Sequence, residues 1–147
     1  MKDIQFRAAT EQDALYLAQH LREADVREVV KMGMRPASAL LTGLRASDLC
    51  LTAELDGKPV MMLGATFPVF GTGEVWALGT DDLFKLKREL LHYGREFVRY
   101  LLDRHDSYAN ASDADYKASH NWLRRIGFKI TDNAAPGFVR INLSRQE

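Results

Sequence analysis

The chain has 147 residues, of which 46% are hydrophobic and 27% are charged, and this predicts one compact domain over residues 1–147. Its 20 basic and 20 acidic residues cancel, so the composition predicts no nucleic-acid or membrane partner. The single cysteine, Cys50, excludes an intramolecular disulfide and fits a reducing compartment. Because no apolar run reaches transmembrane length, we expect a cytoplasmic protein.

The first third of the chain predicts a strand followed by helices. Ile4, Phe6 and Ala8 alternate with polar residues, which is typical of a strand. Thr10 stands three residues before Asp13 and ahead of apolar residues at helical spacing, which predicts a capping box. Two further helices are expected over residues 25–32 and 38–44.

The centre of the chain predicts three strands and a long helix. Two apolar runs flank Asp56-Gly57, a dipeptide that favours a hairpin turn. The second run, residues 60–67, is almost continuously apolar, and residues 74–79 form the next strand. Residues 81–104 then carry an apolar stripe at helical spacing, which predicts one long helix.

The C-terminal part predicts a strand over residues 108–111, a helix and two final strands. The helix is expected to end at Gly127, because only glycine takes the left-handed conformation without a steric clash. Phe128 and Ile130 then alternate with polar residues, as in a half-buried strand, and residues 138–143 form the last strand. This order of elements predicts an α/β (α+β) fold with helices packed on a mixed sheet.

Such an order, with a helix that ends in Ile126-Gly127-Phe128, resembles the GCN5-related N-acetyltransferase (GNAT) superfamily. The resemblance covers nearly the whole chain. It implies a mixed, mostly antiparallel central sheet of about six to seven strands flanked by helices. It also implies acetyl-CoA as the cofactor, and no metal.

A narrower resemblance is to the acetyltransferase-like internal virion proteins of short-tailed bacteriophages. It is carried by the stretches READVREVVKMG, WALGTDDLFK and YANASDADYKASHNWLRRIGF. The matched positions are Arg22, Asp25, Glu28, Gly33, Trp76, Gly79, Thr80, Asn110, Ser119, Leu123 and Gly127. This resemblance implies a phage-encoded protein of the host cytoplasm or the virion.

The GNAT resemblance implies that the CoA pyrophosphate meets the start of the long helix, where free backbone N–H groups and the helix dipole attract anions. The glycine-rich loop of the superfamily falls on residues 82–87, where aspartate and lysines stand instead. The aspartates oppose an anion, whereas the neighbouring basic side chains attract one. The cofactor contacts are therefore assigned to Leu78, Gly79, Thr80, Lys85, Lys87, Arg88 and Asn110. The alternative is a capped helix with a solvated charged face.

The catalytic groups that the resemblance implies are incomplete. The superfamily tyrosine that protonates the leaving thiolate falls on Leu123, which has no proton to donate. Tyr116, at the start of the same helix, is the substitute candidate, and packing is its simpler role. Glu74 is the candidate base, because a carboxyl group beside apolar residues can have a raised pKa. The simpler interpretation of Glu74 is an exposed residue at a turn.

Arg22, Asp25 and Glu28 follow one another at three-residue steps and therefore share one helix face. They form either a surface salt-bridge ladder or a face that binds an acceptor or a partner protein. The four histidines have no metal-ligand spacing, so no metal site is expected.

Two functions remain open from the sequence. One is a phage-encoded, acetyl-CoA-dependent N-acetyltransferase that modifies a host or phage amine. The other is a catalytically inactive GNAT-fold protein that acts in virion assembly or by binding a host protein. The fold alone does not choose between them.

Overall fold

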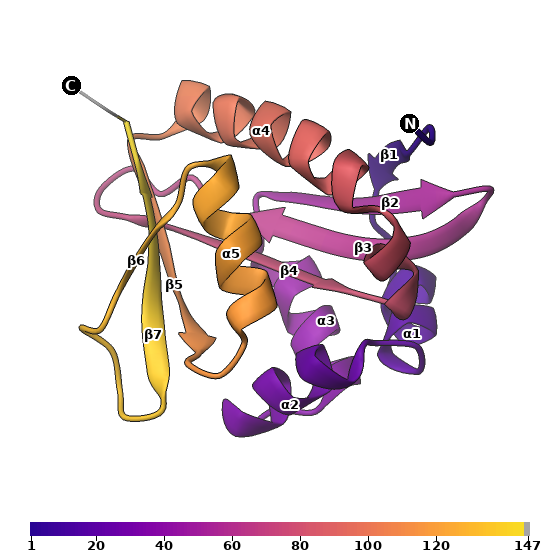
Figure 1. Cartoon of the computed structure of the whole chain (residues 1–147), viewed down its shortest axis with the longest axis horizontal. Coiled ribbons are helices and arrows are strands. Elements are labelled where there is room, and N and C mark those ends of the chain that lie inside the picture. Colours follow the sequence, from indigo (N-terminus) through magenta and orange to yellow (C-terminus); the bar gives the residue numbers. More distant parts are fainter. Residues whose placement is uncertain (146–147) are drawn as a thin grey trace.

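A computed structural model describes residues 1–145 as one seven-stranded sheet with helices on both faces (Figure 1). The elements in chain order are β1 (Gln5–Ala8), α1 (Glu11–Ala18), α2 (Glu23–Lys31), α3 (Pro36–Ala46), β2 (Leu49–Leu55), β3 (Lys58–Ala65), β4 (Gly73–Gly79), the 3-10 helix η1 (Asp81–Lys85), α4 (Lys87–Arg104), β5 (Ser107–Asp113), α5 (Lys117–Ile126), β6 (Lys129–Thr131) and β7 (Phe138–Ser144).

The strands lie in the order β1-β2-β3-β4-β5-β7-β6. Every neighbouring pair is antiparallel except β4 and β5, which run parallel in the middle of the sheet. The predicted mixed, mostly antiparallel sheet flanked by helices is therefore confirmed. The single parallel pair divides the sheet into an N-terminal half of four strands and a C-terminal half of three.

The hydrophobic core lies on both faces of the sheet. On one face α4 and α5 cover side chains of β2 to β5 and β7, including Leu63, Val75 and Ile141. On the other face α1, α2 and α3 pack against Met62 and Leu78. Figure 1 shows α4 above the sheet and α1 to α3 below it. Side chains of alternate residues in β3 and β4 thus enter different cores, as strand geometry requires.

Three local sequence signals form the predicted structures. Thr10 and Asp13 make a reciprocal capping box at the start of α1. Asp56 and Gly57 both have positive φ in the turn between β2 and β3, as a two-residue hairpin of the mirror-image type needs. Gly127 has a φ of 119° and ends α5 in the left-handed conformation. The prediction that α5 stops on this glycine is confirmed.

The prediction of one continuous helix over residues 81–104 is wrong. Residues 81–85 form η1, Leu86 leaves helical geometry with a φ of −117°, and α4 begins at Lys87. Thr80 caps η1 by accepting the Asp82 N–H. Thr80 therefore caps a separate short helix and not α4. No helix among residues 1–145 is both long and apolar enough to cross a membrane.

Candidate functional site

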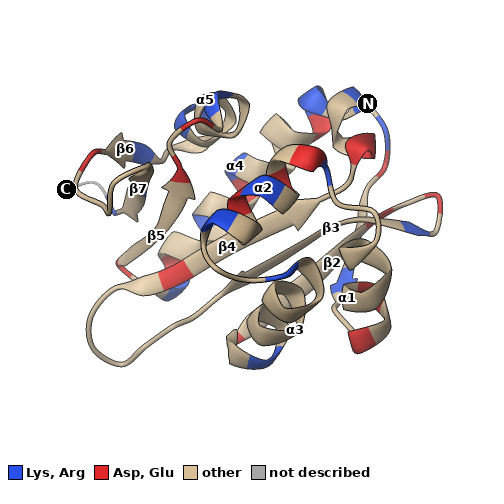
Figure 2. Ribbon diagram, turned by 90° about the horizontal axis from the view of Figure 1, so that it is seen from below, with Lys and Arg blue, Asp and Glu red and all other residues tan. Residues whose placement is uncertain are grey.

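The gap between β4 and β5 is the main opening in the sheet. Within the described residues the two strands pair at two positions, Gly73 with Tyr108 and Glu74 with Ala109. Beyond these pairs the strands diverge (Figure 2). Asn110 bridges the narrow part of the gap by donating its side-chain amide to the backbone carbonyl of Val75 at 2.9 Å.

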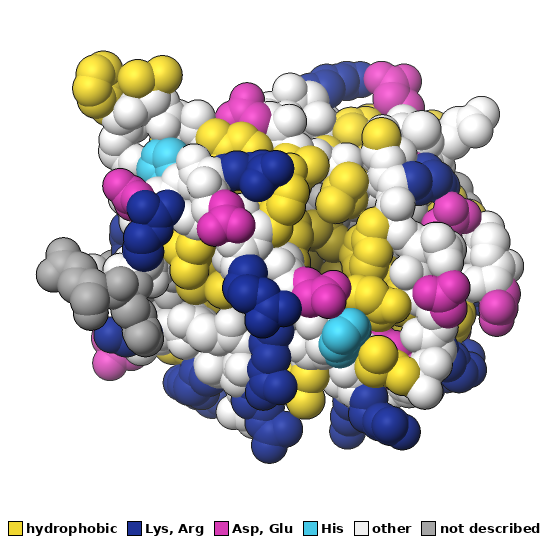
Figure 3. Space-filling view, turned by 90° about the horizontal axis from the view of Figure 1, so that it is seen from above, with side chains coloured by type: hydrophobic (Ala, Val, Ile, Leu, Met, Phe, Trp, Pro, Cys, Tyr) yellow, Lys and Arg dark blue, Asp and Glu magenta, His cyan; other side chains and the backbone are white. Residues whose placement is uncertain are grey.

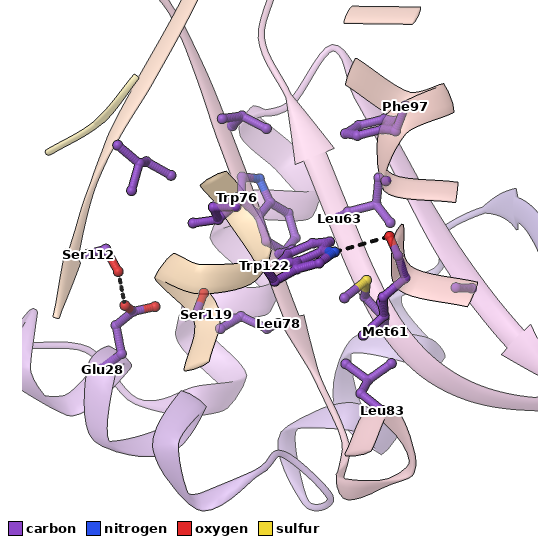
Figure 4. Close-up of a pocket in the computed structure, with 18 of the residues that line it drawn as sticks. Glu28, Met61, Leu63, Trp76, Leu78, Leu83, Phe97, Ser112, Ser119 and Trp122 are labelled. Atoms are coloured by element: carbon purple, nitrogen blue, oxygen red, sulfur yellow. Dashed lines mark hydrogen bonds between the residues drawn. The ribbon is translucent and has the colours of Figure 1, made fainter. Parts of the chain in front are cut away.

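A cavity of about 300 Å³ lies at this gap and extends to both faces of the sheet. Trp76 and Leu78 line it on the side of α2 and α3, and Trp122 and Phe97 line it on the side of α4 and α5 (Figure 4). The volume lies at the lower end of the range for small-molecule sites, about 300–1,000 Å³. The divergence of β4 and β5 therefore creates a pocket of ligand size in the middle of the protein.

Helix α2 covers the wide end of the gap (Figure 2). The helix is bound there to the end of β4 through Asp25. The Asp25 carboxylate is 1% exposed and accepts the Gly79 N–H at 2.7 Å. It also accepts the Tyr116 hydroxyl at 2.5 Å and pairs with Arg22 at 3.1 Å. Of the two alternatives for this helix face, the surface salt-bridge ladder does not apply to Asp25, because its carboxylate faces the sheet and its charge is matched inside the protein.

Glu28, one turn further along α2, is fastened to β5. Its carboxylate accepts the Ser112 hydroxyl at 2.8 Å and the Asp113 N–H at 2.9 Å. Burial raises the pKa of Glu28, and these two hydrogen bonds only partly oppose that shift. The Ser112 hydroxyl also lies 2.9 Å from Nε2 of His120 on α5. Glu28, Ser112 and His120 thus form one buried polar chain beside the cavity.

The third contact of α2 is made by Lys31 near its C-terminal end. Lys31 pairs with the buried Asp113 carboxylate at 2.7 Å and donates to the Gly137 carbonyl. Burial favours a higher pKa for Asp113, but the Lys31 ammonium and the Asp115 N–H outweigh it, and the pKa of Asp113 is lowered. Helix α2 is therefore held to both strands that border the gap.

Glu74 lies at the narrow end of the gap, exposed, and lines the cavity on the face of α3. Its backbone N–H donates to the Thr66 hydroxyl at 2.8 Å. Two residues further on the same face, the Trp76 indole donates to Ser47 of α3 at 2.9 Å. The carboxylate of Glu74 is therefore accessible both to solvent and to a molecule in the cavity.

The predicted cationic cofactor contacts lie at a different place, around the start of α4. A more open pocket of about 480 Å³ is lined there by Met1, Lys2, Phe84, Lys85, Lys87, Arg88 and Glu89. Asp82 pairs with Lys85 at 3.2 Å and with Lys58 at 3.5 Å. Glu89, in the first turn of α4, accepts the Lys2 N–H and its own N–H through its carboxylate. An anion therefore meets basic side chains here, whereas the α4 N-terminus holds a carboxylate of the protein itself.

Neither tyrosine position offers a free proton donor to the cavity. Leu123 is buried in the core, 8% exposed. The Tyr116 hydroxyl is engaged by Asp25, and burial, together with the negative charge of Asp25, raises the pKa of Tyr116. The Tyr116 phenol therefore stays protonated over the physiological pH range.

The structure brings some of the predicted site residues together and separates others. Glu74, Leu78 and Glu28 line the cavity, while Gly79, Thr80, Asp25 and Arg22 lie at its α2-covered end. Lys85, Lys87 and Arg88 belong to the second pocket. Sequence reasoning missed Ser112, His120 and Trp122. Ser112 is the last residue but one of β5, in the Asn-Ala-Ser-Asp run. A polar strand end of this kind often marks a functional site, but no spacing in the sequence linked Ser112 to Glu28.

No protein-family model and no curated protein matches the sequence. Solved structures match over nearly its full length. An acetyltransferase of the GNAT family from Bacillus anthracis superimposes with a TM-score of 0.68 at 12% identity, over 99% of this chain and 97% of that chain. A GNAT-family acetyltransferase from Streptococcus pneumoniae gives 0.60 at 14% identity, over 98% and 100%.

The aminoglycoside acetyltransferase AAC(6')-Ib, solved in complex with coenzyme A, gives a TM-score of 0.70 at 16% identity, over 98% of this chain and 96% of that chain. At such identities the agreement concerns the backbone arrangement. The agreement extends over nearly the whole of each chain, so the arrangement of helices and strands as a whole is shared. The chain has the fold of the GNAT acetyltransferases.

Proposed function

We propose that the protein is an acetyl-CoA-dependent N-acyltransferase. The observation that carries this proposal is the cavity between the diverging strands β4 and β5, with a carboxylate, Glu74, in its wall. Structural neighbours with the same fold are acetyltransferases, and AAC(6')-Ib has been solved with coenzyme A. When bound, acetyl-CoA supplies an acyl group as a thioester that an amine attacks.

The chain offers a place for each part of the donor. The gap between the diverging strands would take the extended arm, and the 480 Å³ pocket at α4 presents Lys85, Lys87 and Arg88 to phosphates. Because Glu89 occupies the α4 N-terminus, the phosphates are held by these side chains and not by helix amides. Leu78, Gly79, Thr80 and Asn110 border the arm along β4 and β5.

Glu74 is the group that handles the acceptor proton in this proposal. As the amine forms its bond to the acyl carbon, the amine proton passes to the Glu74 carboxylate and the carbon–sulfur bond breaks. The leaving sulfur would take its proton from solvent, because Asp25 holds the Tyr116 hydroxyl and the raised pKa of Tyr116 makes it a poor acid. The acceptor enters on the face of α2 and α3, where Glu74 is accessible.

A second candidate is an inactive, phage-encoded GNAT-fold protein of the virion or a host-protein binder. Two observations favour it. Leu123 stands where the superfamily proton donor is expected, and Asp82 and Glu89 place negative charge where the pyrophosphate would bind. In this alternative α2, which carries Arg22 and the exposed Val30, faces the partner protein.

A thermal-shift titration separates the two functions. Acetyl-CoA at a hundred times its Kd should stabilise the folded protein by about 2.7 kcal/mol and raise its Tm. ATP serves as the control, because it carries adenine nucleotide phosphates without the thiol arm. A Tm that acetyl-CoA and ATP leave unchanged at millimolar concentration would rule out the acyltransferase and leave the binding protein.

A further inference from the structure

The two faces of the cavity differ in chemistry. On the face of α2 and α3, its wall includes Glu28, Glu74, Ser112 and Ser47. On the face of α4, the wall is almost entirely apolar. Figure 3, which views the molecule from the side of α4, shows a hollow lined by hydrophobic side chains.

The floor of the apolar part is a continuous strip across four strands, β4, β3, β2 and β1. Ala77 of β4 lies at the gap and is paired with Leu63 of β3. Met61, two residues before Leu63 in β3, is paired with Gly79. Met61 is in turn paired with Ala53 of β2, and Ala53 with Phe6 of β1. These residues alternate along their strands, so their side chains share the face that α4 covers.

The roof of the apolar part is one stripe of α4. Leu86 at the N-cap of α4 and Leu90, Tyr93 and Phe97 within it follow at four-, three- and four-residue steps, and all four line the cavity. Phe6 closes the far end by an edge contact with Tyr93 at 5.3 Å between ring centroids. The roof and floor thus enclose a space that runs from the gap at Ala77 toward Phe6.

The polar groups beside this space already have partners. The Trp122 indole, which forms its wall toward α5, donates to the Leu90 carbonyl at 3.0 Å. The Glu89 carboxylate is bound to the Lys2 N–H at 2.5 Å. A space of this kind takes apolar groups and does not demand a polar ligand.

We infer that the acyl donor of this protein carries an aliphatic acyl chain longer than acetyl, and that the chain lies between α4 and the strip from Ala77 to Phe6. The inference rests on the proposed acyltransferase function. An apolar cavity of roughly 150 Å³ already accommodates a benzene ring. The present cavity has about twice that volume over both faces of the sheet. Because neighbouring strands lie about 4.8 Å apart, its apolar strip from β4 to β1 reaches roughly 14 Å from the gap, farther than an acetyl group extends.

The test measures the affinity of the full chain for CoA and for acetyl-, butyryl-, hexanoyl- and octanoyl-CoA by calorimetry. Affinity should rise by about fourfold for each methylene buried, until the apolar space is full. Equal affinities for acetyl- and octanoyl-CoA would overturn the inference and leave the proposed function intact. Absence of binding by every one of these thioesters would overturn both.

A matched pair of variants locates the chain. Ala53→Leu fills the apolar space under α4, and Ala39→Leu makes the same change at the cavity wall formed by α3. Ala53→Leu should reduce the affinity for octanoyl-CoA by about tenfold or more and leave that for acetyl-CoA unchanged. Ala39→Leu should change the affinity neither for octanoyl-CoA nor for acetyl-CoA. A chain-length preference that survives Ala53→Leu would overturn the inference.

The smaller change Ala53→Val covers the case in which the leucine variant does not fold. Valine suits a strand and adds two carbon atoms to the same wall. In this variant the affinity should stop rising at an acyl chain that is one or two methylenes shorter than in the wild type. An unchanged optimum in a folded Ala53→Val variant would count against a chain in this space.

Discussion

Asp25 of α2 and Gly79 at the end of β4 are joined by a hydrogen bond of 2.7 Å from the glycine N–H to the buried carboxylate. The bond satisfies an edge amide that β5 does not reach, because the two parallel strands have separated before this point. Arg22 and Tyr116 complete the shell around the same carboxylate. Helix α2 thus connects β4 and β5 where the two strands no longer pair with each other.

The first prediction concerns this carboxylate. Asp25→Ala leaves the Gly79 N–H and the Tyr116 hydroxyl without their acceptor in a buried place, so the free energy of unfolding should fall by about 3 kcal/mol. Urea unfolding followed by circular dichroism measures the change. Glu23→Ala on the same helix is the control, since its side chain is 92% exposed, and it should cost less than about 0.5 kcal/mol. An Asp25→Ala variant as stable as the wild type would show that this carboxylate is not a structural group and that the helix face is available to a partner.

The second prediction concerns Gly127, the glycine at which α5 ends. Gly127→Val forces a β-branched residue into a φ of 119° and should lower the free energy of unfolding by about 2 kcal/mol. A Cβ at this position meets Val98 at 3.7 Å, an ordinary contact, so the cost arises in the backbone. Ala118→Val on the exposed side of α5 controls for the added volume. Equal melting temperatures for wild type and Gly127→Val would contradict the left-handed stop.

The third prediction concerns acid stability. Burial alone would raise the pKa of Asp13, but hydrogen bonds from Arg7, Thr52 and Thr10 outweigh it and lower the pKa to about 2 from an ordinary 3.8. Because the folded state favours the ionised carboxylate, its stabilisation is complete above about pH 4 and is lost as the pH falls through about 2. The contribution is about 2 kcal/mol.

Asp13→Asn should remove that contribution at pH 7 and approach wild-type stability near pH 2. Urea midpoints measured from pH 2 to pH 7 report the difference. Asp3→Asn, at an exposed carboxylate, is the control and should leave the pH dependence unchanged. If the midpoints of wild type and Asp13→Asn stay parallel over the whole range, the ion pair of Asp13 with Arg7 does not stabilise the fold.

The fourth prediction tests the placement of the CoA phosphates. Lys85→Glu with Lys87→Glu should weaken acetyl-CoA binding by about tenfold or more, because the pocket at α4 changes from cationic to anionic. Asp82→Gly should strengthen binding, since it frees Lys58 and Lys85 from their ion pairs. Calorimetry at two salt concentrations measures both effects. If the double lysine variant still binds acetyl-CoA tightly, the CoA phosphates bind at another place.

The fifth prediction concerns the proposed base. Glu74→Gln should lower the rate of acyl transfer by about a hundredfold or more and leave acetyl-CoA affinity unchanged, since amide oxygens do not accept the amine proton. Glu54→Gln, a carboxylate far from the gap on β2, is the matched control. Retained activity in Glu74→Gln would assign the proton to another group.

Much of the fold follows from local sequence signals. Three features each depend on a few consecutive residues: the capping box at Thr10, the hairpin turn at Asp56-Gly57 and the end of α5 at Gly127. All three form as predicted. The break at Leu86 was missed because η1 and α4 share one apolar stripe, through Leu83, Leu86 and Leu90. Helical spacing cannot separate a 3-10 turn from the α-helix that follows it at the same face.

The site was less predictable, for a physical reason. Arg22, Asp25 and Glu28 share a helix face, and the sequence shows this spacing but not what the face meets. Its partners Gly79 and Ser112 are distant in the chain and come from the two strands that separate. The burial of a carboxylate by such contacts leaves no periodic trace in the sequence.

The attachment of α2 also has a consequence for the order of folding. Lys31 lies 82 residues before Asp113, and Asp25 lies 91 residues before Tyr116. At ordinary rates of synthesis, Asp113 and Tyr116 are therefore made about 4 to 18 s after the residues of α2 that they contact. Contacts of such long range form late in folding as well. Chains that stop before β5 should retain the β2–β3 hairpin and lose amide protection in α2, so hydrogen exchange in this helix reports whether the C-terminal half has been completed.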